Sequence, residues 1–170
     1  MFAVFIVGNS WGPQLRRISP VLLILLLVLS GCGSSSGGSE PDTSAFKTAF
    51  AAQKKTLSAL GKDVGAAVEG ANQLNDAELV KQFEGLATRA TTLAGTLAQL
   101  EVPKKFKVEL SELQSSLTQV AGTLHSIEAA AAAHDAVAAK VGGEAIVVNA
   151  RQVKTVDDRL SARLGLPSSP

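Results

Sequence analysis

LVKQFEGLATRATTLAGTLAQLEVPKKFKVELSELQSSL, from Leu79 to Leu117, is the stretch that decides the fold of this chain. Its apolar side chains recur at alternating steps of three and four residues on both sides of Pro103, which is the spacing of a buried stripe along a helix. Pro103 separates two such stripes, because proline lacks an amide hydrogen and disfavours helical geometry in the residue before it. The stretch therefore predicts two helices joined by a short turn.

The same spacing continues in both directions from this stretch. Upstream it runs from Phe46 to Leu74, and downstream it extends to Ala131 and returns between Gly142 and Leu164. We therefore expect four helices in a domain of residues 42–166, at about residues 43–73, 76–101, 104–133 and 135–164, followed by a tail, 167–170. Because the connections are short, the predicted fold is all-α, an antiparallel up-down-up-down four-helix bundle.

Capping residues set two of the expected helix boundaries. Asn75 and Glu78 have the spacing of a capping box, in which each side chain accepts a hydrogen bond from the other residue's backbone amide. Asp135 is the expected cap of the fourth helix. A break at Gly142-Gly143 would instead leave a third helix too long to be buried along its length, so this glycine pair is expected to permit a close helix contact or to mark a kink.

The chain begins with the parts of a secretory signal peptide. Val21 to Leu29 is an unbroken aliphatic run that follows the basic pair Arg16-Arg17 and precedes Ser30-Gly31-Cys32. As a helix this run spans only about 14 Å, well short of a hydrocarbon core of about 30 Å. A signal peptide at residues 1–31 is therefore favoured over a transmembrane helix.

Leu29-Ser30-Gly31-Cys32 resembles the lipobox of bacterial lipoproteins. The resemblance implies cleavage between Gly31 and Cys32 and diacylation of Cys32. Two acyl chains are enough for stable anchoring in membrane lipid. The expected location is the extracytoplasmic face of the cell membrane, or the outer membrane in a cell that has one. Residues 32–41, rich in glycine and serine, then form a flexible tether.

Two details of the leader stay open. Translation starts either at Met1 or near Leu15, because residues 1–15 are apolar and uncharged ahead of the arginines. Export by the general route is expected, since the residues around Arg16-Arg17 do not complete a twin-arginine motif. The part after Cys32 resembles Ala-rich, all-helical bacterial lipoproteins, chiefly in Leu97 to Pro103 and in Arg163 to Leu166, and this resemblance transfers no function.

Composition excludes several function classes. The 16 basic residues are balanced by 15 acidic ones, which argues against a nucleic-acid partner, because that needs a basic stripe. The single cysteine excludes an internal disulfide and a multi-cysteine metal site. Only four aromatic residues follow Cys32, namely Phe46, Phe50, Phe83 and Phe106, too few for an aromatic cage or a base-stacking platform.

The histidines do not form a convincing metal site. His125 and Glu128 lie on the same helical side but beside the apolar stripe, so a solvated pair is favoured over metal ligation. His134 next to Asp135 is explained by a turn and a cap. No nucleophile elbow or phosphate-binding loop is present, and we expect neither an enzyme nor a cofactor.

Lys104, Lys105 and Lys107 form the densest basic cluster. In the expected topology the cluster lies at the end of the bundle where the first helix begins. There it would contact the membrane surface, because anionic headgroups attract each nearby lysine by about 1 kcal/mol. The alternative is a solvated helix start.

The resulting hypothesis is a lipid-anchored, noncatalytic interaction or accessory protein of the bacterial envelope, whose protein partner the sequence does not identify. The alternative is an envelope lipoprotein that binds an apolar ligand or a metal between its helices. Stripes filled by leucine and phenylalanine predict a dry, packed interior, whereas ligand binding needs a cavity with converging polar groups. Gln53 and Asn149 are the polar residues in the stripes that could begin such a site.

Overall fold

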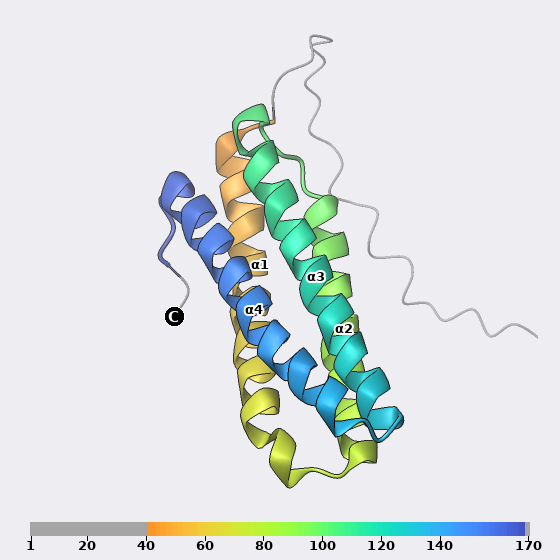
Figure 1. Cartoon of the computed structure of the whole chain (residues 1–170). Coiled ribbons are helices and arrows are strands. Elements are labelled where there is room, and N and C mark those ends of the chain that lie inside the picture. Colours follow the sequence, from red (N-terminus) through yellow and green to blue (C-terminus); the bar gives the residue numbers. More distant parts are fainter. Residues whose placement is uncertain (1–40, 169–170) are drawn as a thin grey trace, which may run out of the picture. The chain divides into compact units, whose positions relative to one another are not determined.

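A computed structural model describes residues 41–168, and every regular element in that range is a helix (Figure 1). The chain divides into two units, Met1–Gly38 and Ser39–Pro170, and the helices belong to the second. The expected signal peptide, Gly31, Cys32 and nearly all of the tether lie outside the described residues. The buried core lies within Ser39–Pro170, so this unit has the hydrophobic core that independent folding requires.

The first helix, α1, spans Thr43–Gly70 and continues as a short 3-10 helix, η2, at Ala71–Gln73. Asp42 caps α1: its carboxylate accepts hydrogen bonds from the backbone amide of Ser44 over 3.0 Å and from the Ser44 hydroxyl over 2.6 Å. These bonds satisfy a first-turn amide that has no partner inside the helix. Of the expected stripe, the apolar side chains from Phe46 to Ala67 are buried.

The second helix, α2, spans Asp76–Ala98 and begins with the capping box expected at Asn75 and Glu78. The Asn75 amide donates to Glu78 Oε2, and the Glu78 amide donates to Asn75 Oδ1, each over 3.0 Å. The helix ends before residue 101, because the chain must leave helical geometry ahead of Pro103. Pro103 is followed by a 3-10 turn, η3, at Lys104–Phe106.

The third and fourth helices, α3 at Lys107–Ala132 and α4 at Ala136–Leu164, meet at a turn around His134. His134 has a φ of 55°, and the Asp135 amide donates to the carbonyl of Ala130 over 2.9 Å. This is the Schellman motif, which usually places glycine at the left-handed position. Gly165, with a φ of 63°, ends α4 by the same motif.

The four helices pack against each other around α3, which contacts α2 and α4 along much of its length. Contacts of α1 are sparser, above all those with α4. The core draws on all four helices and includes fully buried side chains such as Phe50, Phe83, Leu113, Leu124 and Leu160. The statement that the described part is an all-α assembly of four packed helices is thus confirmed.

Gly142 brings α3 and α4 close together. A Cβ atom at this position would lie 2.5 Å from Cγ1 of Ile127, whereas one at Gly143 would meet nothing within 4 Å. Of the two roles that the sequence left open for the glycine pair, close contact therefore applies to Gly142. Gly143 has no packing role of this kind.

Candidate binding cleft

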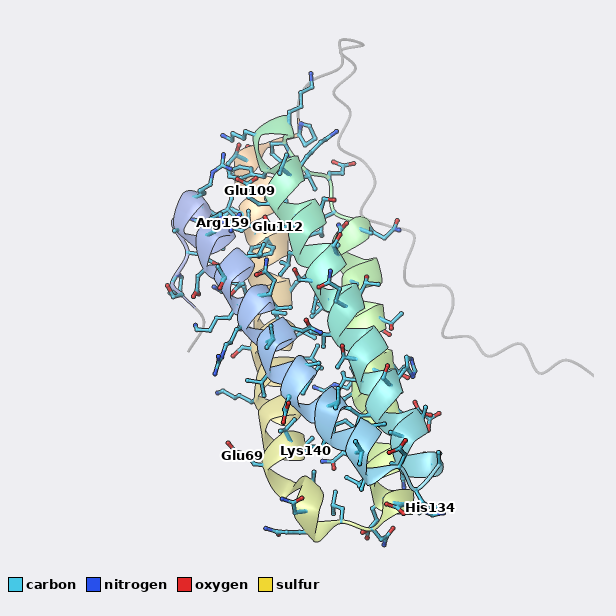
Figure 2. All side chains as sticks on the ribbon, in the orientation of Figure 1. Glu69, Glu109, Glu112, His134, Lys140 and Arg159 are labelled. Carbon is cyan, nitrogen blue, oxygen red and sulfur yellow. The ribbon has the colours of Figure 1, made fainter. Side chains whose placement is uncertain are left out.

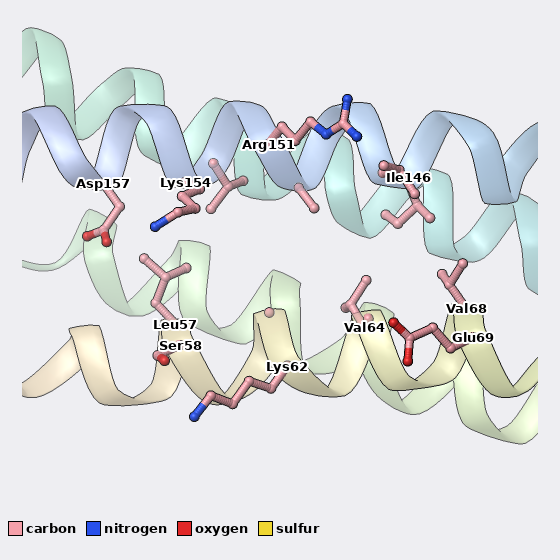
Figure 3. A pocket seen from close by; sticks show the side chains of 15 residues that line it. Leu57, Ser58, Lys62, Val64, Val68, Glu69, Ile146, Arg151, Lys154 and Asp157 are labelled. Atoms are coloured by element: carbon pink, nitrogen blue, oxygen red, sulfur yellow. The ribbon is translucent and has the colours of Figure 1, made fainter. Parts of the chain in front are cut away.

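The boundary between α1 and α4 contains a cleft of about 470 Å³. Its apolar lining includes Val64 and Val68 from α1 and Ile146 and Val153 from α4, as Figure 3 shows in part. A volume of this size lies in the usual range for small-molecule sites, which are mostly apolar with a few polar groups. The cleft opens at the edge of the core, because Leu57, Val64, Ile146 and Val153 on its lining are themselves buried.

Two glycines on α1 explain why the cleft is open. Gly61 and Gly65 line it, and a Cβ atom at either position would have nothing within 4 Å. They lie one helical turn apart beside the buried stripe, so α1 presents backbone toward α4 where a larger side chain would fill the space. Each glycine costs a helix about 0.5–1 kcal/mol relative to alanine, and packing within the described residues does not require either one.

One end of the cleft is closed by a polar cluster of Lys54, Asp157 and Ser161. Asp157 and Ser161 are fully buried. The Lys54 ammonium lies 3.4 Å from Asp157 Oδ2 and donates to Ser161 Oγ over 2.6 Å. It also donates to the carbonyl of Pro167 over 2.6 Å. The cluster therefore joins α1, α4 and the segment that follows α4.

This cluster is better explained as a structural contact than as a serine nucleophile with a lysine base. A nucleophile must be reachable by its substrate, and Ser161 has no exposed surface. The Lys54 ammonium is engaged by three acceptors, and Ser161 Oγ lies 3.3 Å from Asp157 Oδ1, to which it donates. The burial of Asp157 and Ser161 could not be predicted from the sequence pattern, because each directly follows a residue of the apolar stripe.

Charged side chains surround the cleft from both helices: Lys62 and Glu69 from α1, and Arg151 and Lys154 from α4 (Figure 3). Lys154 forms an ion pair with Asp158 over 3.3 Å. Asp157 is paired with Lys54, as described above. The remaining charges on the lining are two cations and one carboxylate, so the rim has an excess of positive charge.

Gln53 and Asn149 do not line the cleft. Both are half-buried, and Asn149 Nδ2 donates to Thr123 Oγ1 on α3 over 2.8 Å. The polar group of Asn149 therefore bridges α4 to α3. The signal in the sequence that could have identified the cleft was the Gly61 and Gly65 spacing beside the stripe.

The lysines of the basic cluster lie at the end of the helical unit where α1 begins. The Phe106 ring stacks on the Phe46 ring with centroids 5.5 Å apart. Lys105 Nζ lies over the Phe106 ring at 5.1 Å, and Arg163 also lies over it at 5.1 Å. Lys104, Lys105 and Lys107 are exposed. This basic end is distinct from the cleft.

Ion pairs link α3 to α4 at the edge of their contact. The two histidines lie at the surface. Arg159 on α4 donates to Glu112 on α3 over 2.8 Å, and Figure 2 shows both at the end opposite His134. His125 Nδ1 lies 2.9 Å from Glu128 Oε2 at the exposed surface. His134 contacts Asp76. Among residues 41–168 no three His, Cys, Asp or Glu side chains are grouped so that they could hold a metal ion.

The carboxyl group of Asp42 has a lowered pKa. The pKa of Asp42 is held below its ordinary value of 3.8, first by the hydrogen bond from the Ser44 hydroxyl and then by that from the Ser44 amide. Both bonds favour the ionised carboxylate. The group lies at the exposed start of α1 and not in the cleft.

Comparison with known proteins adds no relative. No family model, no curated protein and no solved structure matches this chain. Within the part of the chain that the structure describes, none of the helices combines the length and the apolar character needed to cross a membrane.

Proposed function

We propose that this protein is a lipid-anchored, noncatalytic accessory protein of the bacterial envelope that acts by holding an apolar ligand in the cleft between α1 and α4. The anchoring part rests on the resemblance of Leu29-Ser30-Gly31-Cys32 to a lipobox. The binding part rests on the cleft, which is lined by valine, leucine and isoleucine side chains and surrounded by charged ones.

The cleft is the observation that favours ligand binding over the other functions that the sequence left open. An apolar surface between helices is normally removed from water by packing, since this burial is the main favourable contribution to folding. Here Gly61 and Gly65 have no side chains that could fill the space between α1 and α4. The two glycines lower the stability of α1 and leave apolar surface accessible. A ligand that covers this surface would explain both features. A metal ligand gains no support from the residues described.

We also propose the up-down-up-down antiparallel topology for the four helices. Contacts between α3 and α4 support it, because Glu109 near the start of α3 contacts Arg163 near the end of α4. The α1 and α4 contacts have the same sense: Lys47 near the start of α1 donates to the carbonyl of Gly165 after α4 over 3.2 Å.

In this topology the basic end would face the membrane. A tether of about nine residues rich in glycine and serine reaches only about 15–18 Å as a coil, so an acylated Cys32 would hold the start of α1 near the bilayer. Lys104, Lys105 and Lys107 are exposed at that end. Binding of residues 39–170 to anionic vesicles but not to neutral ones, and its loss at high salt, tests this orientation. Equal binding to both kinds of vesicle would contradict it.

A protein partner is the second candidate, and a specific surface favours it. Val137, Val141 and Val148 on α4 are 76%, 61% and 63% exposed. Their spacing of four and seven residues places them on one face of the helix. Crosslinking of the anchored protein in intact cells, compared between the natural chain and a variant with these valines changed to serine, would identify a partner that uses this face.

Binding in the cleft can be tested with a neutral naphthylamine dye whose fluorescence rises in apolar surroundings. A soluble protein of residues 39–170 should enhance the dye fluorescence, and Gly65→Leu should abolish the enhancement by filling the cleft. Gly122→Leu is the matched control, since Gly122 is also a helical glycine with open space around it, on α3. Equal dye binding by both variants would refute the proposed site.

Anchoring needs a separate experiment. Cys32→Ser should abolish incorporation of labelled fatty acid and leave a larger, unprocessed precursor. The natural chain should lose Trp11, its only tryptophan, on processing. Retained labelling of the variant would remove the lipoprotein part of the proposal and leave the cleft untouched.

A further inference from the structure

The charged groups on the cleft lining point in different directions. Figure 3 shows the Lys62 ammonium on the side of α1 away from α4, and the Arg151 guanidinium on the side of α4 away from α1. The Glu69 side chain instead runs from its end of the cleft back toward the middle. The two cations that give the rim its positive excess are therefore turned away from the cleft, and the charged group that reaches its opening is a carboxylate.

The surroundings of Glu69 within the helix do not explain its position. Among residues 41–168 its carboxylate takes part in no hydrogen bond and no ion pair. None of the residues three or four positions away from it in the sequence is basic, so an ion pair along α1 is not available. Glu69 also lies in the last turn of α1, which ends at Gly70, and the helix dipole disfavours a negative charge there.

The other carboxylate of the lining, Asp157, is already matched by a cation. Asp157 is buried and lies 3.4 Å from the Lys54 ammonium. Lys154, the third cation of the lining, is paired with Asp158 over 3.3 Å. These contacts leave Glu69 as the carboxylate of the lining that a ligand could neutralise.

We infer that the ligand is an amine with an apolar body, which lies in the cleft while its ammonium group contacts the Glu69 carboxylate at the opening. This inference rests on the proposed function, since it names the chemical class of the ligand. The apolar body would cover the valine and isoleucine surface of the lining. The ammonium group would stay hydrated at the opening, because Glu69 is exposed, and would avoid the cost of burying a charge.

Titration calorimetry on residues 39–170 tests the inference, with decylamine, decanol and decanoate as probes at neutral pH and below micelle formation. The three share one hydrocarbon chain and differ in the charge of the head. Decylamine should bind more tightly than decanol by about two- to five-fold, as expected of an exposed ion pair, and this preference should shrink at high salt. Decanoate should bind more weakly than decanol, because Glu69 repels it. Affinity should rise from hexylamine to decylamine by about two- to four-fold per methylene.

Glu69→Gln should bind decylamine and decanol equally and leave the affinity for decanol unchanged. The matched control is Glu84→Gln, which removes the same charge from an exposed position of α2 outside the lining and should keep the preference for decylamine. A preference that survives in Glu69→Gln would overturn the assignment of the head, and tighter binding of decanoate than of decylamine would overturn the amine. If the neutral dye binds the natural sequence and decylamine binds no better than decanol, the inference fails while the proposed function stands. If the dye does not bind either, both fail.

Discussion

The two sides of α4 are built in different ways. Toward α3, α4 packs closely, with Gly142 against Ile127 and ion pairs such as Arg159 with Glu112 at the edge. Toward α1 it is held by the buried contact between Lys54 and Asp157, beyond which the two helices enclose an apolar cleft. One helix can therefore serve as a rigid wall on one side and as half of a binding site on the other.

The largest effect is expected from breaking the polar contact at the end of the cleft. Lys54→Met should lower the free energy of unfolding by about 3–5 kcal/mol, because Asp157 would be left as an uncompensated buried charge. Adding Asp157→Leu to this variant should recover most of the loss. Chemical denaturation of the natural chain and the two variants measures both values. A single variant as stable as the natural chain would show that the contact does not hold α1 to α4.

Replacing a leucine with alanine should lower stability by different amounts on the α3 side and on the α1 side of α4. Leu124→Ala, at a fully buried position of α3, should lower stability by about 2–5 kcal/mol through lost burial and the cavity left behind. Leu57→Ala should cost about 1–2 kcal/mol, since the space it leaves joins an existing cleft. Denaturant midpoints compare the two variants. Equal losses would mean that α1 packs on α4 as closely as α3 does.

Substitution of the adjacent glycines Gly142 and Gly143 should change stability by smaller amounts and in opposite directions. Gly142→Ala should destabilise by about 1–2 kcal/mol, because overpacking against Ile127 outweighs the gain in helix propensity. Gly143→Ala should stabilise by about 0.5–1 kcal/mol, because its Cβ atom meets nothing. Thermal unfolding measures both. A stabilising Gly142→Ala would show that α3 and α4 can separate without loss.

The smallest effect concerns the cap of α1. The pKa of Asp42 is lower in the folded chain than in the unfolded chain. The ionised carboxylate therefore stabilises the fold at a pH above its ordinary pKa, and this stabilisation is lost as the pH falls through the lowered pKa of the folded chain. Asp42→Asn should remove this part of the pH dependence. Ser44→Ala should move the pKa of Asp42 back toward its ordinary value, which NMR titration of the carboxyl group measures. An unchanged pKa would contradict the assigned cause.

The apolar stripes could be predicted from the sequence because they depend on local periodicity. The spacing of Phe83, Leu86 and Leu97, like that of Leu110 and Leu124, reflects one face of a helix whatever that helix packs against. The Asn75 and Glu78 capping box is local in the same way and is present in the structure. Buried polar groups were harder to predict, since Asp157 and Ser161 are stabilised by Lys54, which is distant in the sequence.

The sequence by itself thus determined the all-helical class and the apolar stripe that each helix buries, because both follow from interactions within a few residues. It also carried the lipobox resemblance at Cys32, which lies outside the described residues. Only the tertiary structure decided that α1 and α4 enclose a cleft and that Lys54 meets the buried Asp157 at its end. The spacing and register of two helices depend on the side chains of both at once, and here on polar contacts, such as that of Lys54 with Asp157, between residues far apart in the chain.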